Sequence, residues 1–179
     1  DLVAALLPPE RVAGFPEQAL DYSCLHDLPR EWAAPARFYA YLAEPVLALR
    51  PDLVIADRWN QPETTERLRE AGVTTLVLPE VARYEDAREL LLTAGRVLGE
   101  EARAAALAAD LDRRVARLRD GAEARARVRA LCYPNFGGGG WTAAAGTTMH
   151  AAMELCGLRN AAAEGGREGH RPIDLEELL

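Results

Sequence analysis

Residues 84–124 read YEDARELLLTAGRVLGEEARAAALAADLDRRVARLRDGAEA and lie in the longest segment of the chain without proline. Alanine, leucine, arginine and glutamate dominate this stretch, and all four favour helix. After Gly99, apolar residues recur every three or four positions, which places them on one helix face. They are Leu107, Leu111, Val115, Leu118 and Ala122. The pattern predicts a helix over 100–124, roughly 37 Å long at about 1.5 Å per residue, with this face against a core.

Before this helix, the sequence predicts a parallel α/β unit. A helix at 44–49 and a proline precede an apolar strand at 53–56, whose continuous apolar run suits a parallel sheet covered on both faces. A helix beginning at Thr64 or Thr65 ends at Gly72, and a strand follows at 75–78. Strand, helix and strand at this spacing form a βαβ unit.

The segments on either side of these elements are shorter. A helix is expected at 1–7 and a strand at 12–14, followed by irregular structure over 17–42. After the long helix, a strand is expected at 128–133. A second helix is expected to be capped by Thr147 or Thr148, to end at Gly157, and to be followed by another helix that starts at Asp174.

We therefore expect an α/β fold in three parts. Residues 1–83 form an N-terminal lobe, residues 84–125 a linking helical region, and residues 126–179 the start of a C-terminal lobe. Both ends of the chain interrupt helix-like sequence, so we expect a fragment of a longer protein.

Composition excludes several classes of function. The net charge of −7 argues against sequence-independent nucleic-acid binding, which needs clustered basic residues. No apolar run approaches the ~20 residues of a membrane span, and LVAALL near the start is too short for a signal core. Cys24, Cys132 and Cys156 are far apart and show no zinc-ligand spacing.

A glycine run is the first candidate for chemistry. It comprises Gly137, Gly138, Gly139 and Gly140. A strand, a glycine-rich turn and a helix can hold a phosphate, so one hypothesis is an α/β enzyme that binds a nucleotide or phosphorylated metabolite. The chain has no lysine for a Walker A loop, and the next helix starts too late for a dinucleotide fingerprint. Two other interpretations stay open: the loop brings backbone close to a ligand or to the other lobe, or it is a plain connection between two elements.

No catalytic constellation is recognisable. His26, His150 and His170 include no pair at helical ligand spacing, and GxSxG is missing. We predict no catalytic residue and no protein-held metal ion. Among the histidines, His170 is the better site candidate because it lies in a glycine-rich loop.

Aromatic and amide side chains follow successive predicted strands. Trp59 and Asn60 follow the strand at 53–56, and Tyr84 follows the strand at 75–78. Phe136 and Trp141 follow the strand at 128–133. Ligands bind outside the carboxyl ends of parallel strands, so these residues predict a ring-lined cleft. The alternative is that they are isolated hydrophobic loop residues.

A set of motifs along the whole chain carries a resemblance to one family. The motifs are LLPPERVAGF at 6–15, AEPVLALRPDLVIA at 43–56, TTERLREAG at 64–72 before TTLVLP, LGEEARAAAL at 98–107, GWTAAAGTTMHAAMELCGLRNAAAE at 140–164, and IDLEELL at 173–179. In this order they resemble the class III periplasmic substrate-binding proteins, which have a helical backbone. These proteins serve ABC importers of cobalamin, ferric siderophores and haem.

The resemblance implies a binding protein without enzymatic activity. Its two Rossmann-like lobes would be joined by a rigid helix, with a cobalt or iron chelate held between them. Cobalamin or a ferric siderophore is favoured over haem, and no resident cofactor is implied. The expected partner is an importer permease, and the expected location is the periplasm. The protein would be a monomer that reaches the membrane only through the transporter or a lipid anchor.

The resemblance also suggests roles for individual residues. The ligand-facing positions are Tyr22, Ser23, Trp59, Asn60, Tyr84, Trp141 and His170. Glu63 and Glu154 correspond to the two surface glutamates that meet arginines of the permease. Two departures stand out: the family's first N-lobe strand is absent, and the chain ends before the C-lobe is finished. A sensor on the same fold that has lost transport is a further alternative.

Overall fold

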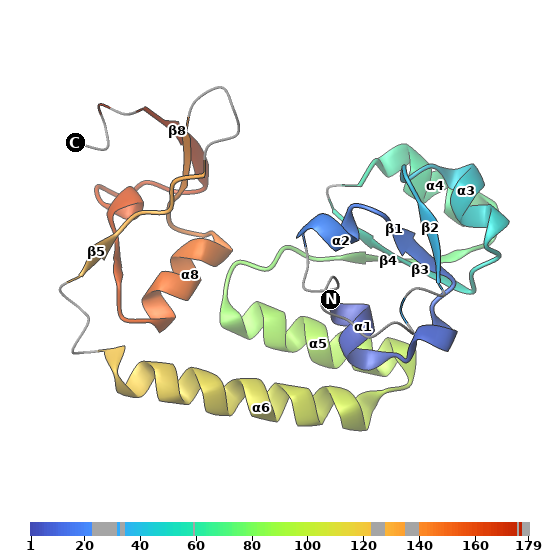
Figure 1. Ribbon diagram of the computed structural model, residues 1–179, viewed down its shortest axis with the longest axis horizontal. Helices are drawn as coiled ribbons and strands as arrows, with labels where there is room; N and C mark the ends of the chain where they lie inside the picture. Colours follow the sequence, from blue (N-terminus) through green and yellow to red (C-terminus); the bar gives the residue numbers. More distant parts are fainter. Residues whose placement is uncertain are drawn as a thin grey trace. The chain divides into compact units, whose positions relative to one another are not determined.

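The computed structural model describes residues 1–22, 32, 35–58, 60–122, 128–134, 140–174 and 176. Helices alternate with pairs of parallel strands in this part of the chain, which confirms the α/β class (Figure 1). The chain forms two compact units. The first comprises Asp1–Glu80 with Thr93–Ala104, and the second Val81–Leu92 with Ala105–Leu179. The three-part division expected from the sequence stays a prediction.

The βαβ unit predicted in the first half of the chain is confirmed. Strand β3 (Leu53–Asp57) and strand β4 (Thr74–Leu78) pair in parallel, with Leu53 opposite Thr74. Helix α4 (Pro62–Glu70) connects them. Proline occupies its first turn, where the missing N–H costs nothing, and Gly72 follows its end at φ +82°.

A small apolar core holds this unit together. Helix α3 (Ala43–Ala48) and helix α4 pack on each other, and their buried side chains meet strand β3. The cluster consists of Ala43, Val46, Val54 and Leu68. Two buried threonines of α4 are satisfied by Tyr41, because the Thr64 hydroxyl donates to its carbonyl at 3.1 Å and the Thr65 hydroxyl lies 3.3 Å from its phenol oxygen.

The N-terminal part contains more structure than the sequence suggested. Strand β1 (Gly14–Pro16) begins two residues after the expected strand start and pairs in parallel with β2 (Ala36–Phe38). Helix α2 (Ala19–Tyr22) and strand β2 both lie within the segment predicted to be irregular, so that prediction was wrong there. Both elements are too short to leave a periodic signal.

Charged side chains attach the first residues to the helical region. Helix α1 (Leu2–Leu6) and the 3₁₀ turn η1 (Pro9–Arg11) begin the chain. The Arg11 guanidinium pairs with Glu100 at 2.6 Å and donates to the Leu98 carbonyl at 2.9 Å. Arg103 donates to the Ala5 carbonyl at 2.6 Å. These bonds hold the N-terminal segment where the two long helices meet.

The stretch 84–124 forms two helices, α5 (Tyr84–Leu98) and α6 (Glu101–Asp120). The chain turns at Gly99, which has φ +71°, a conformation that glycine adopts without strain. The helix predicted over 100–124 therefore ends at 120 among the described residues. Its predicted apolar face was only partly right, since Val115 is buried while Leu111 and Leu118 are exposed.

Small residues form the buried face of α6 instead. Ala104 and Ala108 are almost fully buried, as is Ala94 of α5. A methyl group added to Gly95 would lie 2.3 Å from the Ala104 methyl. The backbones of α5 and α6 thus approach too closely at this point for a side chain on both.

The second unit contains two short strand pairs. Strand β5 (Arg129–Ala130) pairs in parallel with β7 (Arg159–Asn160), and strand β6 (Gly140–Ala143) pairs antiparallel with β8 (His170–Ile173). The strand predicted at 128–133 is thus confirmed over only two residues. The β6–β8 pair was not predicted, because GWTA and HRPI carry glycine and proline and no apolar alternation.

Helix α8 (Thr148–Leu155) has the predicted ends. The Thr147 hydroxyl accepts from the His150 backbone N–H at 3.2 Å, so Thr147 is the cap, and Gly157 follows the helix at φ +73°. The turn η4 (Ala161–Ala163) comes after β7. Most of the helix expected from Asp174 lies outside the described residues. No helix among the described residues has the length and apolar character needed to cross a membrane.

The close approach of α5 and α6 can be tested by moving one methyl group. Gly95→Ala is expected to lower the free energy of unfolding by about 1–3 kcal/mol, because the added methyl overpacks the contact. In an unconstrained helix the same change stabilises by about 1 kcal/mol. Adding Ala104→Gly should restore room, so the double variant is expected to be more stable than Gly95→Ala alone. Urea unfolding measures all three, and a stabilising Gly95→Ala would contradict the contact.

Candidate functional site

The structure brings two predicted ligand residues together on strands β6 and β8. Trp141 pairs with Pro172, and Ala143 pairs with His170. Paired residues, and residues two apart on one strand, share a face, so Trp141 and His170 lie on the same face of the ladder. Such diagonal neighbours are ~7–8 Å apart, within reach of an aromatic ring. Trp141 is 43 % exposed and His170 is also exposed.

Packing beneath this face fixes the strand that carries the indole. The Tyr133 ring lies against Gly140, where an added methyl would be 1.9 Å from a ring carbon. The backbone N–H of Trp141 donates to the Pro134 carbonyl at 3.0 Å. On the opposite face of the ladder, Thr142 and Ile173 are buried. Packing on the opposite face therefore holds in place the backbone that carries the indole and the imidazole. This arrangement is suited to stacking on a flat ligand.

The structure gives Gly140, the last residue of the glycine run, a role other than phosphate binding. Gly140 is required for packing against Tyr133, whereas residues 137–139 lie outside the described part of the chain. Helix α8 begins only at Thr148, and the Thr147 side chain already satisfies one N–H of its first turn. The described geometry thus offers no helix terminus directly after the glycines.

Tyr84, a third predicted ligand residue, is bound within the protein. Its hydroxyl donates to Asp112 of α6 at 2.7 Å, and the Arg88 guanidinium donates to both Asp112 oxygens at 3.1 and 3.0 Å. Burial, reinforced by the bond to Asp112, raises the pKa of Tyr84 to about 12. The same bond lowers the pKa of Asp112 from its ordinary value. The hydroxyl joins α5 to α6, and a ligand contact by the ring stays a prediction.

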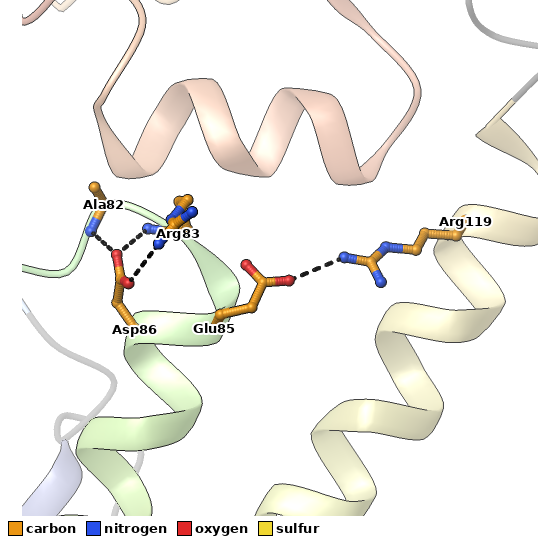
Figure 2. A network of polar contacts seen from close by, with 5 residues as sticks. All are labelled: Ala82, Arg83, Glu85, Asp86 and Arg119. Atoms are coloured by element: carbon orange, nitrogen blue, oxygen red, sulfur yellow. Dashed lines mark hydrogen bonds and ion pairs between the residues drawn. The ribbon is translucent and has the colours of Figure 1, made fainter.

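The start of α5 is fixed by acidic residues that the sequence analysis missed (Figure 2). Asp86 accepts from the backbone N–H groups of Ala82 and Arg83 at 3.1 and 2.9 Å, and these bonds lower its pKa. Glu85 pairs with Arg119 of α6 at 3.4 Å. Acidic residues in a first helical turn are the usual sequence signal for such capping.

The remaining predicted ligand residues are in the N-terminal part. The Asn60 side chain accepts from the Asp57 N–H at 2.6 Å and so fixes the turn after β3. Tyr22 ends helix α2, and its side chain is not described. Ser23 and Trp59 lie outside the described residues.

A cavity of about 1030 Å³ lies within the first unit, and Asn60 is among its lining residues. Consecutive residues 12–16 and 50–55 line it. Because side chains alternate along a strand, consecutive lining residues mean that the edges of β1 and β3 face the cavity. Such edges are typical sites for pairing with an extended segment.

The two predicted docking glutamates differ in their local setting. Glu63 is exposed in the first turn of α4, where the helix dipole stabilises a negative charge. Glu154 is 65 % exposed in the last turn of α8, where the dipole disfavours it, and no basic residue lies in that turn. The helix dipole thus explains why a glutamate at position 63 is favourable for its helix, but it does not explain the glutamate at position 154.

No group of three or more histidine, cysteine, aspartate or glutamate side chains among the described residues could hold a metal ion. Cys132 and Cys156 are half-buried. The prediction that the protein itself holds no metal ion stays a prediction.

A family model described as "Periplasmic binding protein" matches residues 41–179. The chain belongs to the periplasmic binding protein family. The resemblance drawn from the motifs is thereby confirmed, and the family consists of substrate-binding transport proteins, not enzymes.

Three similar proteins place this periplasmic binding protein among relatives of known type. A "Cobalamin-binding protein" of Halobacterium salinarum is 34% identical over 136 residues, which are 76% of this chain and 37% of that protein. A periplasmic heme binding protein of Pseudomonas aeruginosa is 29% identical over 99% of this chain and 63% of the other, with a TM-score of 0.79. An ABC-type Fe3+-hydroxamate transport system of Saccharomonospora viridis is 25% identical over 99% and 66%, with a TM-score of 0.72.

These matches confirm the fold of this periplasmic binding protein over nearly all of its residues. They also show that the chain spans little more than a third of the cobalamin-binding relative and about two thirds of the two solved proteins. Family membership implies a location outside the cytoplasm.

The Tyr84–Asp112 bond predicts a pH-dependent stability. Tyr84→Phe is expected to lower the free energy of unfolding at neutral pH by about 1 kcal/mol, because it removes a hydrogen bond to a carboxylate. Since the phenol pKa rises from 10.0 to about 12 on folding, this contribution is present below pH 10 and is lost as pH rises through 12.

Urea unfolding at neutral and alkaline pH measures this effect. The matched control is Tyr39→Phe, because Tyr39 is 78 % exposed and should lose no stability. Equal unfolding free energies for Tyr84→Phe and the unchanged protein at neutral pH would refute the role given to the hydroxyl.

Proposed function

We propose that this protein is the extracytoplasmic receptor of an ABC importer and that it binds a metal chelate. Cobalamin or a ferric siderophore is the preferred ligand, ahead of haem. Family membership supports the receptor role, and the ligands named for the three relatives support the chelate class. The relative with the highest identity among these is named for cobalamin, which supports placing cobalamin first.

The observation that carries the ligand proposal is the face shared by Trp141 and His170. An exposed indole on a fixed strand can stack on a macrocycle or a catecholate ring. The imidazole beside it can hydrogen-bond the ligand's periphery or approach its metal. Neither step forms or breaks a covalent bond, so the activity is capture and delivery.

The second part of the proposal concerns docking. Glu63 and Glu154 each meet cationic side chains of the permease. Both are exposed, and the unfavourable helix position of Glu154 is understandable if its charge serves a partner rather than the fold. The enzyme hypothesis based on the glycine run receives no support from the family or from the position of α8.

Ligand binding by the Trp141–His170 face can be measured directly. Titration of the full-length protein with cyanocobalamin, haemin and ferric hydroxamates, followed by tryptophan fluorescence, is expected to show saturable quenching by one class. Trp141→Ala is expected to weaken its binding by about 1–2 kcal/mol, because stacking is lost. Tyr39→Ala removes an exposed aromatic ring of the other unit and is the control. Unchanged affinity in Trp141→Ala would exclude this face as the ligand site.

Docking can be separated from ligand binding. Glu63→Arg combined with Glu154→Arg should leave the chelate affinity unchanged and abolish uptake through the importer, because like charges would meet at the contact. Glu70→Arg reverses another exposed charge on α4 and should leave uptake intact. Normal uptake by the double variant would contradict the docking roles, and chelate binding without any importer contact would indicate a sensor.

A further inference from the structure

A chain of polar side chains in the second unit leads from strand β6 to Glu154. Asn160 is buried, with 6 % of its surface exposed, and its amide nitrogen donates to the Ala143 carbonyl at 2.7 Å. The same nitrogen lies 3.2 Å from His150 Nδ1. The other ring nitrogen of His150, Nε2, lies 3.5 Å from the Glu154 carboxylate.

Backbone partners determine which way the Asn160 amide points. Its oxygen accepts from the Ala162 N–H at 3.0 Å, while its nitrogen donates to the Ala143 carbonyl. The reverse orientation would set oxygen against carbonyl oxygen and N–H against N–H. The nitrogen therefore faces His150 as a donor.

This orientation determines the tautomer of the imidazole. Because Nδ1 faces an N–H donor, it must act as an acceptor, and the ring proton of neutral His150 lies on Nε2. That N–H is on the side of the Glu154 carboxylate. The His150 side chain is only 20 % exposed, whereas Glu154 is 65 % exposed, so the chain begins in the core and ends at the surface.

We propose that Asn160 and His150 are positioning residues that hold the Glu154 carboxylate ready for a cationic partner surface. The inference rests on the docking role proposed above and deepens it. A free glutamate side chain loses rotamer freedom when it docks, and a carboxylate already held by His150 loses less. The partner side chain that fits an exposed, oriented carboxylate is a guanidinium, which binds both oxygens at once.

Nuclear magnetic resonance of the full-length protein labelled with ¹⁵N-histidine tests the first half of this proposal. The full sequence contains three histidines, and loss of one signal in His150→Gln assigns His150. At a pH where the ring is neutral, the expected signature is the Nε2–H tautomer. A predominant Nδ1–H tautomer, or an equal mixture of the two, would overturn the proposal that His150 links Asn160 to Glu154.

The second half is tested by affinity for the importer reconstituted in lipid vesicles. His150→Leu removes both contacts at similar size and is expected to weaken docking by about fivefold. His150→Gln keeps an acceptor for Asn160 and a donor for Glu154, so its affinity should stay close to that of the unchanged protein. Chelate affinity should be the same in both variants.

Glu154→Arg distinguishes the two ways in which the idea could fail. If Glu154→Arg abolishes docking while His150→Leu does not weaken it, Glu154 docks without a positioning relay. If Glu154→Arg docks normally, the docking role itself is wrong, whatever the tautomer of His150.

Discussion

The close approach of helices α5 and α6 at Gly95 is a steric constraint on both helices. At Gly95 and Ala104 the two backbones come so close that only one of the two positions can carry a methyl group. Farther along the same pair, Asp112 receives a hydrogen bond from Tyr84 and two from Arg88. Both helices contribute residues to each compact unit. Arg11 and Arg103 attach the N-terminal segment to these helices.

The sequence predicted the elements whose signals are local. Proline and Gly72 frame α4, Thr147 and Gly157 frame α8, and the apolar run at 53–56 identified β3. The division of the long helix was missed because a single glycine looks tolerable within an alanine-rich helix. The buried alanine face of α6 was missed for a related reason: hydrophobic patterning weights Leu111 and Leu118 above Ala104 and Ala108, yet close packing favours the small residues.

The candidate site was less predictable than the fold. Trp141 and His170 were identified one by one, but the ladder that places them on one face joins segments about 30 residues apart, and it leaves no periodic pattern. The bond that engages Tyr84 depends on Asp112, which sequence reasoning treats as one more charge on a helix surface. Asn160 and His150 were missed as a pair because they lie on different elements, and because the amide of Asn160 is oriented by the Ala143 carbonyl of β6, which is distant in sequence.

Native-state hydrogen exchange is the measurement that most sharply examines the role given to α5 and α6. If this helix pair is the stable centre of the chain, the amides around Gly95 and Ala104 should exchange only through global unfolding and be the most slowly exchanging in the chain. Those of the short β5–β7 and β6–β8 pairs should exchange faster, through local opening. Rapid exchange at the α5–α6 contact, with slower exchange in β3 and β4, would contradict this view and place the stable centre in the βαβ unit.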